Sequence, residues 1–412
     1  MNKYFDVLTI LLIVALIFAS LAHGRWLPYR LNIILAVMGV IAFFGQCRKV
    51  WDLLPKCLGF VWLLWLAAGV LSLVWAIDPE YSWKEFKNDG LLPAGLFFSL
   101  LILLNKGWQV KAVWGAFLAA SLVLAASGYA EFIGGILDRP DHAFLWPGVE
   151  NRVRGLAPHV HTYLMIIFMS FPFWIYAIYL AGSARQRLFW GAGLVVVFVG
   201  WLLGHGRVEM AFLPVFLVLT FLMVCLKRRW FNTLIAVMFI SSFVFVGWLS
   251  QLPYQMKSSN IHQRQFMWNL AANYIERHPF TGIGFGALSY MQLDETGLSD
   301  FPDSPAKSMS PSGGGNHPHN FFVNIWLTTG LQGFLALITL AIILYLTVSQ
   351  AIDPKPGVDQ QLLFGLRAFC LAMIACGMIN MADSLLVRNV IKLFCVLAAA
   401  GVKSVYILKS DR

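Results

Sequence analysis

The residues best suited to chemistry form one short segment, Asn316-His317-Pro318-His319-Asn320, at the end of a long polar loop. An apolar stretch follows directly and runs on through Gly330. A helix needs apolar residues to cross a bilayer and has no need of imidazoles. An imidazole titrates near neutral pH, so it can accept a proton from a substrate hydroxyl. The segment therefore predicts acid–base chemistry at a membrane surface.

Arginines give the second signal. Arg207 stands between two apolar stretches with almost no loop, and Arg264 lies in the long polar loop. Membrane insertion disfavours positive charge at these positions, whereas a guanidinium binds phosphate through two parallel N–H bonds and stays charged. We therefore expect both to hold a diphosphate. The alternative is snorkelling to lipid headgroups or pairing with Glu209. We assign four other arginines to the same outer side of the membrane: Arg139, Arg152, Arg154 and Arg277.

Further histidines map to the same ends of the predicted spans, which we call the outer rim. His159 and His161 open another apolar stretch, and His205 lies beside Arg207. Such a cluster suits zinc only with fixed geometry, and no His-x3-His pair shares a helix face. No Asp-x-Asp pair in an outer loop marks a magnesium site, and the six cysteines match no zinc spacing. We therefore expect no metal and no cofactor.

These side chains must be positioned by membrane helices. The chain is 59% hydrophobic and 12% charged, against about 25% charged residues in soluble domains. Apolar runs long enough to cross a bilayer fill it, which predicts an all-α polytopic membrane protein. We place twelve spans, near 5–22, 27–45, 57–76, 90–104, 108–133, 157–181, 187–203, 208–226, 230–250, 319–349, 362–382 and 386–408.

Lysine and arginine in short loops orient these spans, because cytoplasmic loops carry the positive excess. The basic short loops alternate, which assigns both termini to the cytoplasm and the polar loops 135–156 and 251–318 to the outside. The basic clusters are Arg48 and Lys49, Lys106 and Lys111, Arg185 and Arg187, and 227–229. The net charge of +10 therefore follows from topology, and no nucleic-acid partner is expected.

The predicted organisation has three parts: spans one to nine in 1–250, an outer loop in 251–318, and spans ten to twelve in 319–412. Within the loop, apolar residues recur at four-residue steps from Gln263 to Arg277. This spacing predicts an amphipathic helix, lying on the membrane or packed on the spans, that Pro279 ends. The glycine-rich stretch 281–286 lacks the spacing and the preceding strand of a nucleotide-binding loop.

Three motifs resemble those of bacterial O-antigen ligases. His319-Asn320, nine residues and then Gly330 is similar to their His-Asn-x9-Gly signature. Gly206-Arg207, at the start of a span, resembles the site of their first essential arginine. Arg264-x2-Met267-Trp268, followed by residues 278–286, resembles the loop segment with the second. Length, spans and outer loop agree, and the likeness covers most of residues 150–345.

The resemblance implies a GT-C-like glycosyltransferase of the bacterial inner membrane with its active site facing the periplasm. It would transfer O-antigen polysaccharide from undecaprenyl diphosphate to lipid A-core, with inversion and without metal. His319 would be the catalytic base, and Arg207 and Arg264 would hold the diphosphate. Asn320, His159 and Arg154 complete the expected substrate-binding residues.

Three alternatives stay open. An O-antigen polymerase uses the same donor and a second lipid-linked acceptor. Oligosaccharyltransferases of the same superfamily typically add a soluble C-terminal domain, whereas this sequence ends soon after the last predicted span. A transporter would place charged residues or broken helices near the bilayer midplane. Its candidates here are Arg367, Asp383 and Lys392, which lie near span ends or allow snorkelling.

Overall fold

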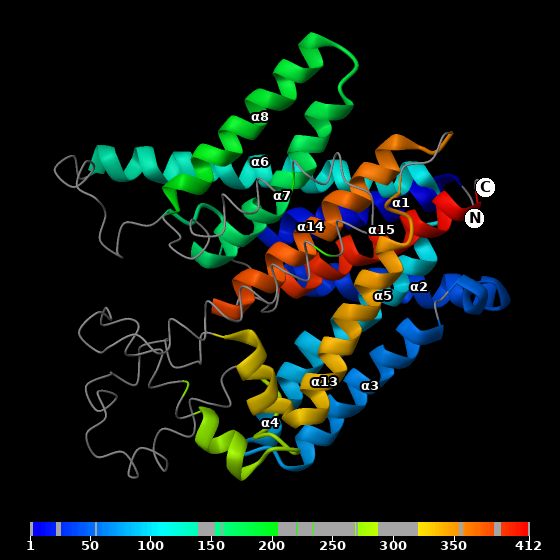
Figure 1. Cartoon of the computed structure of the whole chain (residues 1–412), viewed down its shortest axis with the longest axis vertical. Helices are drawn as coiled ribbons and strands as arrows, with labels where there is room; N and C mark the ends of the chain where they lie inside the picture. The colour runs from blue at the N-terminus through cyan, green and yellow to red at the C-terminus, as the bar shows by residue number, and fades with distance from the viewer. Residues whose placement is uncertain are drawn as a thin grey trace.

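The computed structural model describes most of the helical regions of the chain. The described residues are 3–21, 26–53, 56–138, 153–157, 160–204, 271–286, 320–353, 357–382 and 389–410, with single positions at Thr220, Thr233 and Trp268. All regular elements in this part of the chain are helices (Figure 1). The fold is therefore all-α, as the composition predicts.

The described helices include most of the predicted spans. They are α1 (Lys3–Leu21), α2 (Trp26–Leu53), α3 (Lys56–Val74), α4 (Pro79–Glu85), η1 (Phe86–Leu91), α5 (Leu92–Leu103), α6 (Gly107–Asp138), α7 (Val160–Leu180), α8 (Ala184–Leu203), α13 (Phe321–Ser349), α14 (Gln360–Ala382) and α15 (Asn389–Ser410). Eight stretches among the described residues are long and apolar enough to cross a membrane. The predicted spans 208–226 and 230–250 lie outside the described residues.

Two predicted boundaries differ from the structure by more than five residues. The fourth span begins at Pro79 instead of residue 90, because α4, the π-helix η1 and α5 form one continuous span. Its first turns carry charges that lower the local hydropathy, yet Glu85 is only 4% exposed. The second helix continues to Leu53, eight residues beyond the predicted span and through the basic residues Arg48 and Lys49.

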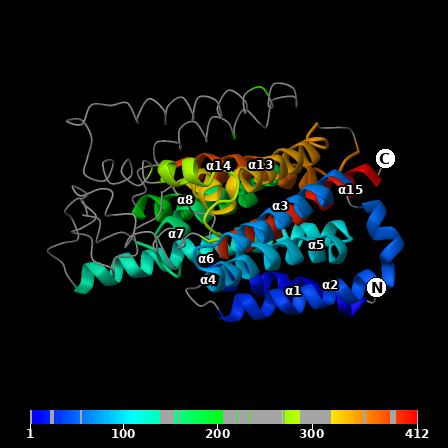
Figure 2. The same ribbon diagram turned by 90° about the horizontal axis from the view of Figure 1, so that it is seen from below.

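The helices run between two ends of the bundle. Both termini lie close together at one end, which we call the terminal end (Figures 1 and 2). The opposite end, where α13 begins and α6 finishes, is called the loop end. The shared position of the termini agrees with an even number of spans. Which side of the membrane the terminal end faces stays a prediction.

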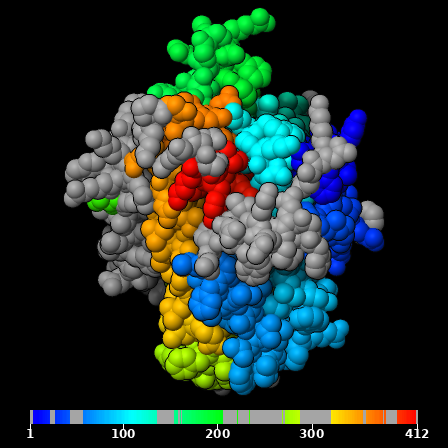
Figure 3. All heavy atoms as spheres, turned by 90° about the vertical axis from the view of Figure 1, so that its right-hand side faces the viewer, coloured from blue at the N-terminus to red at the C-terminus, as the bar shows by residue number. Residues whose placement is uncertain are grey.

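The interior of the bundle is built around α15. This helix packs against α1, α5, α6, α13 and α14, and 78% of its most apolar stretch is buried. Figure 3, which faces the terminal end, shows its last turns enclosed by neighbouring helices. By contrast, only 17% of the corresponding stretch of α8 is buried. α8 therefore lies at the periphery, held mainly by α6 and α7.

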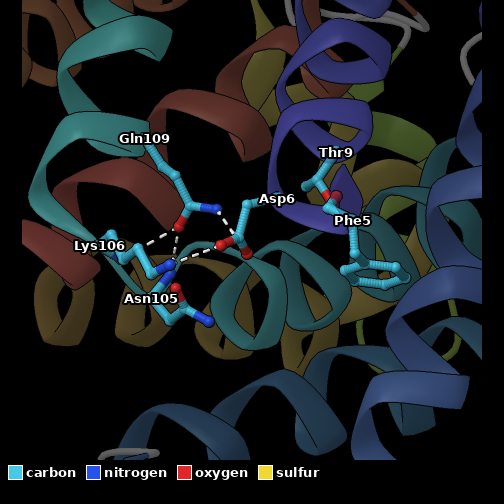
Figure 4. Close-up of polar contacts among 6 residues, drawn as sticks. All are labelled: Phe5, Asp6, Thr9, Asn105, Lys106 and Gln109. Carbon is cyan, nitrogen blue, oxygen red and sulfur yellow. Dashed lines mark hydrogen bonds and ion pairs between the residues drawn. The ribbon is translucent and has the colours of Figure 1, made fainter. Parts of the chain in front are cut away.

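An ion pair between buried Asp6 and half-exposed Lys106 fixes α1 to the start of α6 at the terminal end (Figure 4). Asp6 is 1% exposed and accepts from Lys106 Nζ at 2.6 Å and from Gln109 Nε2 at 3.3 Å. The Gln109 side-chain oxygen in turn accepts from the backbone N–H groups of Asn105 and Lys106. Because a buried carboxylate is costly without partners, this cluster sets the register of the two helices.

Arg367 does not reach toward water. It is 2% exposed, and its Nε and Nη2 donate to the carbonyl of Ile352 at 3.0 and 2.7 Å. Ile352 follows the end of α13, so the guanidinium satisfies a carbonyl just beyond a helix C-terminus. Lys392 is likewise buried at 5% exposure, and Asp383 lies outside the described residues. Of the two placements that the sequence allows, snorkelling does not apply to Arg367, whose guanidinium instead holds the backbone just after α13.

Candidate functional site

The signature residue Asn320 is the N-cap of α13. Its side-chain oxygen accepts from the N–H groups of Phe322 and Val323 at 3.0 and 3.1 Å. Asparagine is among the preferred N-caps because it satisfies donors that the first helical turn leaves open. The helix begins at Phe321, two residues after the predicted start of the span. His319 is therefore adjacent in sequence to a fixed helix cap.

The second signature residue, Gly330, interrupts α13. Its φ of 71° and ψ of −179° are non-helical and lie in a region that essentially only glycine occupies. In a continuous helix Leu331 N–H would donate to Leu327. Here it donates to the carbonyl of Pro279 at 2.9 Å. The first part of α13 is thus a separate short helix, residues 321–329.

A segment of the preceding loop, residues 278–284, fills this interruption, and we call it the plug. Ile283 N–H donates to the Leu327 carbonyl at 2.9 Å, and Gly284 N–H donates to Thr328 at 3.1 Å. The Trp326 indole N–H donates to Pro279 at 3.2 Å. These bonds replace helical bonds lost at the interruption, so the short helix and the plug form one hydrogen-bonded unit.

The glycines of the plug are required by close backbone approach. Gly282 has a φ of 67°, and a Cβ there would lie 2.5 Å from the Thr328 carbonyl oxygen and 2.6 Å from Gly330 N. A Cβ on Gly330 would overlap the carbonyl of Phe280. Each glycine therefore allows the backbone of the plug and the backbone of α13 to approach each other closely. This explains the glycine-rich stretch without a nucleotide.

Apolar packing supports the same unit. Ala271, Ile283 and Leu327 are almost fully buried together, and Tyr274 and Val323 pack on them. Residues 271–277 are helical, which confirms the described part of the predicted amphipathic helix. They pack on the short helix of α13, so the spans, and not only a membrane surface, hold this segment. The plug also bonds to the connection between α3 and α4, where Ile77 N–H donates to the carbonyl of Ile283.

A largely apolar cavity of about 200 Å³ opens beside the short helix and follows α13 from Phe321 to Leu344. Its polar residues gather near the loop end, where Asn324 and Thr328 of α13 face Asp89 of η1. Asn324 is 6% exposed, and its side-chain oxygen is buried without a hydrogen-bond partner. Buried acceptors normally have a donor, so this oxygen is suited to a ligand or water.

Arg154 is the other predicted site residue that the structure describes. It lies in a five-residue segment, 153–157, that leads toward α7. The carboxylate of Glu131 on α6 accepts from the N–H groups of Arg154 and Gly155 at 2.9 and 2.6 Å. Ser127, one turn earlier, accepts from Leu156 N–H at 3.0 Å. The backbone at Arg154 is thus fixed on α6 while the residue itself is exposed.

The remaining predicted site residues fall outside the described part of the chain: His319, Arg207, Arg264 and His159. Their roles stay predictions. Arg154 and Asn320 lie on separate supports, one on α6 and the other on α13, both at the loop end. Among the described residues no three His, Cys, Asp or Glu side chains gather as a metal site would require. The side chains of the rim histidines are not among those described.

Several residues of this region were not predicted from the sequence. Glu131 and Ser127 are four residues apart on one face of α6, a polar pair in an otherwise apolar span, and that spacing was available as a signal. Asn324 stands one turn after Asn320 in an apolar helix and gave a similar signal. The sequence gave no signal for the π-helix that carries Asp89, although π-turns are often found at functional sites.

Comparison with known proteins identifies the domain that contains this unit. The family model described as O-antigen ligase matches residues 192–338. Over this segment the chain is similar to the O-antigen ligase family. A search of curated proteins finds no match. The matched segment includes the plug, the cap at Asn320 and the interruption at Gly330, so the described unit is part of the family domain. The match supports a function of the general O-antigen ligase or polymerase type.

Proposed function

We propose that this protein is an O-antigen ligase of the bacterial inner membrane. It would transfer polysaccharide from undecaprenyl diphosphate to the outer-core sugar of lipid A-core at the periplasmic face. The oxygen of the acceptor hydroxyl forms a bond to the anomeric carbon, and the bond from that carbon to the diphosphate oxygen breaks. The proton goes to His319, and undecaprenyl diphosphate leaves. Direct displacement inverts the anomeric centre.

One observation carries this proposal. Asn320 and Gly330 of the family signature are the cap and the end of one short helix, and the plug that holds this helix belongs to the loop of Arg264. In sequence, the proposed base His319 directly precedes this hydrogen-bonded unit, and Arg264 lies seven residues before Ala271, which packs on it. Catalytic groups require such fixed mutual positions, because small displacements reduce the rate strongly.

The proposed roles follow from the chemistry of the leaving group. A diphosphate already carries negative charge, and arginines aimed at it stabilise the charge that develops as the bond breaks. Arg207 and Arg264 are assigned this task. A sugar hydroxyl is a weak nucleophile until a base removes its proton. The N-terminus of α13 bears a partial positive charge, which favours the neutral form of the adjacent imidazole.

The cavity beside α13 supports a lipid-linked donor. Its apolar walls extend from the polar groups near Asn324 toward Leu344, deep in the bundle. A hydrocarbon chain is stabilised by such walls at about 25 cal/mol per Å² of buried apolar surface. The polar end lies within two turns of the cap at Asn320. A lipid chain in the cavity would place its head group near the start of α13.

The interruption in α13 does not favour a transporter. Transporters use broken helices near the midplane whose free backbone groups bind the cargo. Here the carbonyls of Leu327 and Thr328 are occupied by the plug. Its bonds serve to position the start of α13.

A null strain and a purified protein together test the proposal. Loss of all O-antigen bands from lipopolysaccharide in the null strain supports a ligase, whereas a single repeat on core indicates a polymerase. Purified protein should then transfer polysaccharide from the lipid diphosphate to lipid A-core. Uptake of substrate into vesicles without any transfer would contradict the proposal and indicate a transporter.

A further inference from the structure

A second cavity lies at the terminal end, far from the candidate site. It has a volume of about 350 Å³, is partly open to the outside, and is lined by residues of α6, α7, α8 and α14 and of the turn between α7 and α8. Small residues leave room in its walls, among them Gly115, Ala177 and Gly365. In Figure 3 the turn between α7 and α8 (green) protrudes from the rest of the bundle. The cavity therefore lies where the peripheral helix α8 meets the core.

The polarity of the walls changes in one direction. On α6 the lining residues are Lys111, then Trp114, then Leu118, each about one turn further from the terminal end. On α14 the lining runs from Gln361 to Ala368 in the same sense. With a rise of 1.5 Å per residue, Trp114 lies roughly 4.5 Å deeper than Lys111. Charged, amphipathic and apolar residues thus follow one another, as do phosphate, ester and hydrocarbon in a phospholipid.

Trp114 supplies a donor without a partner. The residue is 5% exposed, and its indole N–H is buried and makes no hydrogen bond. The ring packs on Phe173 and Phe369, and its nitrogen faces Gly365, which also lines the cavity. A buried N–H of this kind normally has an acceptor. The ester carbonyl of a lipid at this depth would be one.

The rim of the cavity carries a positive excess. Lys111 pairs with Asp359 at 2.6 Å, so these two charges balance. Arg185 and Arg187, at the start of α8, are exposed and add two positive charges. Arg187 Nε donates to the carbonyl of Ala181, itself a lining residue, so one cation is held at the rim. Basic pockets between membrane helices are suited to anionic head groups.

We propose that this cavity binds an anionic phospholipid from the leaflet at the terminal end. Its phosphate lies against Arg185 and Arg187, an ester carbonyl accepts from the Trp114 N–H, and one acyl chain fills the cavity. The lipid completes the packing of α8, the least buried of the candidate spans. This inference does not depend on the proposed transfer reaction.

Lipid retention by the purified full-length protein provides the first test. The protein in detergent is incubated with equal amounts of phosphatidylglycerol and phosphatidylcholine of identical chains, and bound lipid is measured by native mass spectrometry. We expect at least threefold preference for phosphatidylglycerol. A Cβ on Gly115 meets open space within the cavity, so Gly115→Leu should fill it and lower retention about tenfold. Gly59→Leu on α3 also points into open space and should retain lipid normally.

Two further variants separate the head group from the ester. The double variant Arg185→Gln and Arg187→Gln should lose the preference for phosphatidylglycerol while it still binds phosphatidylcholine. Trp114→Phe removes the N–H donor, together with part of the ring, and keeps an aromatic side chain at this position; it should weaken retention of both lipids several-fold. Normal retention by Gly115→Leu would overturn the proposal, as would equal binding of the two lipids by the wild type. If Gly115→Leu does not fold, a photoreactive phosphatidylglycerol decides: labelling away from α6, α7, α8 and α14 overturns the site.

Discussion

His319 is the residue on which the proposed reaction depends most. His319→Ala should lower the transfer rate of purified protein about 10²- to 10⁴-fold, the usual contribution of a general base. Donor lipid should still bind, because the arginines remain. The wild-type rate should fall as the pH drops below neutrality, since a protonated imidazole cannot accept a proton. EDTA should leave the rate unchanged.

His317→Ala is the matched control, because that imidazole lies two residues away and lacks the signature spacing to Gly330. It should be much milder. A near-normal rate for His319→Ala would contradict the assignment. So would loss of activity on chelation that Mg²⁺ restores.

Arg207 and Arg264 are expected to bind the diphosphate through paired N–H groups. Replacing either with Ala should abolish transfer while the amount of membrane-inserted protein, measured by immunoblot, stays normal. Lys should restore little activity, because a single ammonium cannot reproduce bidentate geometry. Full activity of both Lys variants would show that charge alone is sufficient.

Gly330 tests the structural meaning of the signature. Gly330→Ala places a side chain in a backbone region that costs about 1–3 kcal/mol, and its Cβ overlaps the Phe280 carbonyl. We expect a lower melting temperature in detergent and loss of transfer. Gly95→Ala on α5 is the control, because its Cβ meets open space and alanine favours a helix. Equal melting of the two variants would show that the interruption is not required.

At the scale of elements, hydropathy predicted the spans well where apolar residues are continuous. It missed the start of the fourth span because Glu85 and its charged neighbours lower the average, although tertiary packing buries part of this turn. It also gave no sign of the interruption in α13. The backbone of Gly330 is set by contacts with residues 278–284, some fifty positions earlier, which periodicity within one helix cannot reveal. The signature glycine was found by resemblance, and its physical reason came from the structure.

The segment 153–157 gives an element-scale prediction. Glu131→Ala removes the acceptor for two backbone N–H groups, so hydrogen exchange at Arg154 and Gly155 should accelerate, measured by mass spectrometry. Exchange in the middle of α7 should not change. Tyr129→Phe, which removes a bond to Val196 on the neighbouring helix α8, should leave the segment unaffected. Unchanged exchange in Glu131→Ala would mean that the carboxylate does not hold Arg154.

At the scale of the whole molecule, the two ends of the bundle should face opposite sides of the membrane. Cysteines introduced as Ser258→Cys and Ser312→Cys should react with an impermeant reagent in spheroplasts, because both lie in the predicted outer loop. Gln186→Cys, at the terminal end, should react only after the membrane is opened. Its labelling in intact spheroplasts would contradict the predicted orientation.

The plug has a consequence for how this family can vary. Gly286, Phe321 and Asn324 line the same cavity, so the residues on the two sides of 287–319 lie at one place in the bundle. Whatever path residues 287–319 follow, they depart from and return to one place. Additional loop length costs little, about 0.6 kcal/mol for each doubling. Relatives should therefore differ freely in length within 287–316, whereas insertions between 278 and 284 or between 320 and 330 should be rare. The same feature makes 287–316 the natural place to insert a reporter domain or to split the chain into two co-expressed halves.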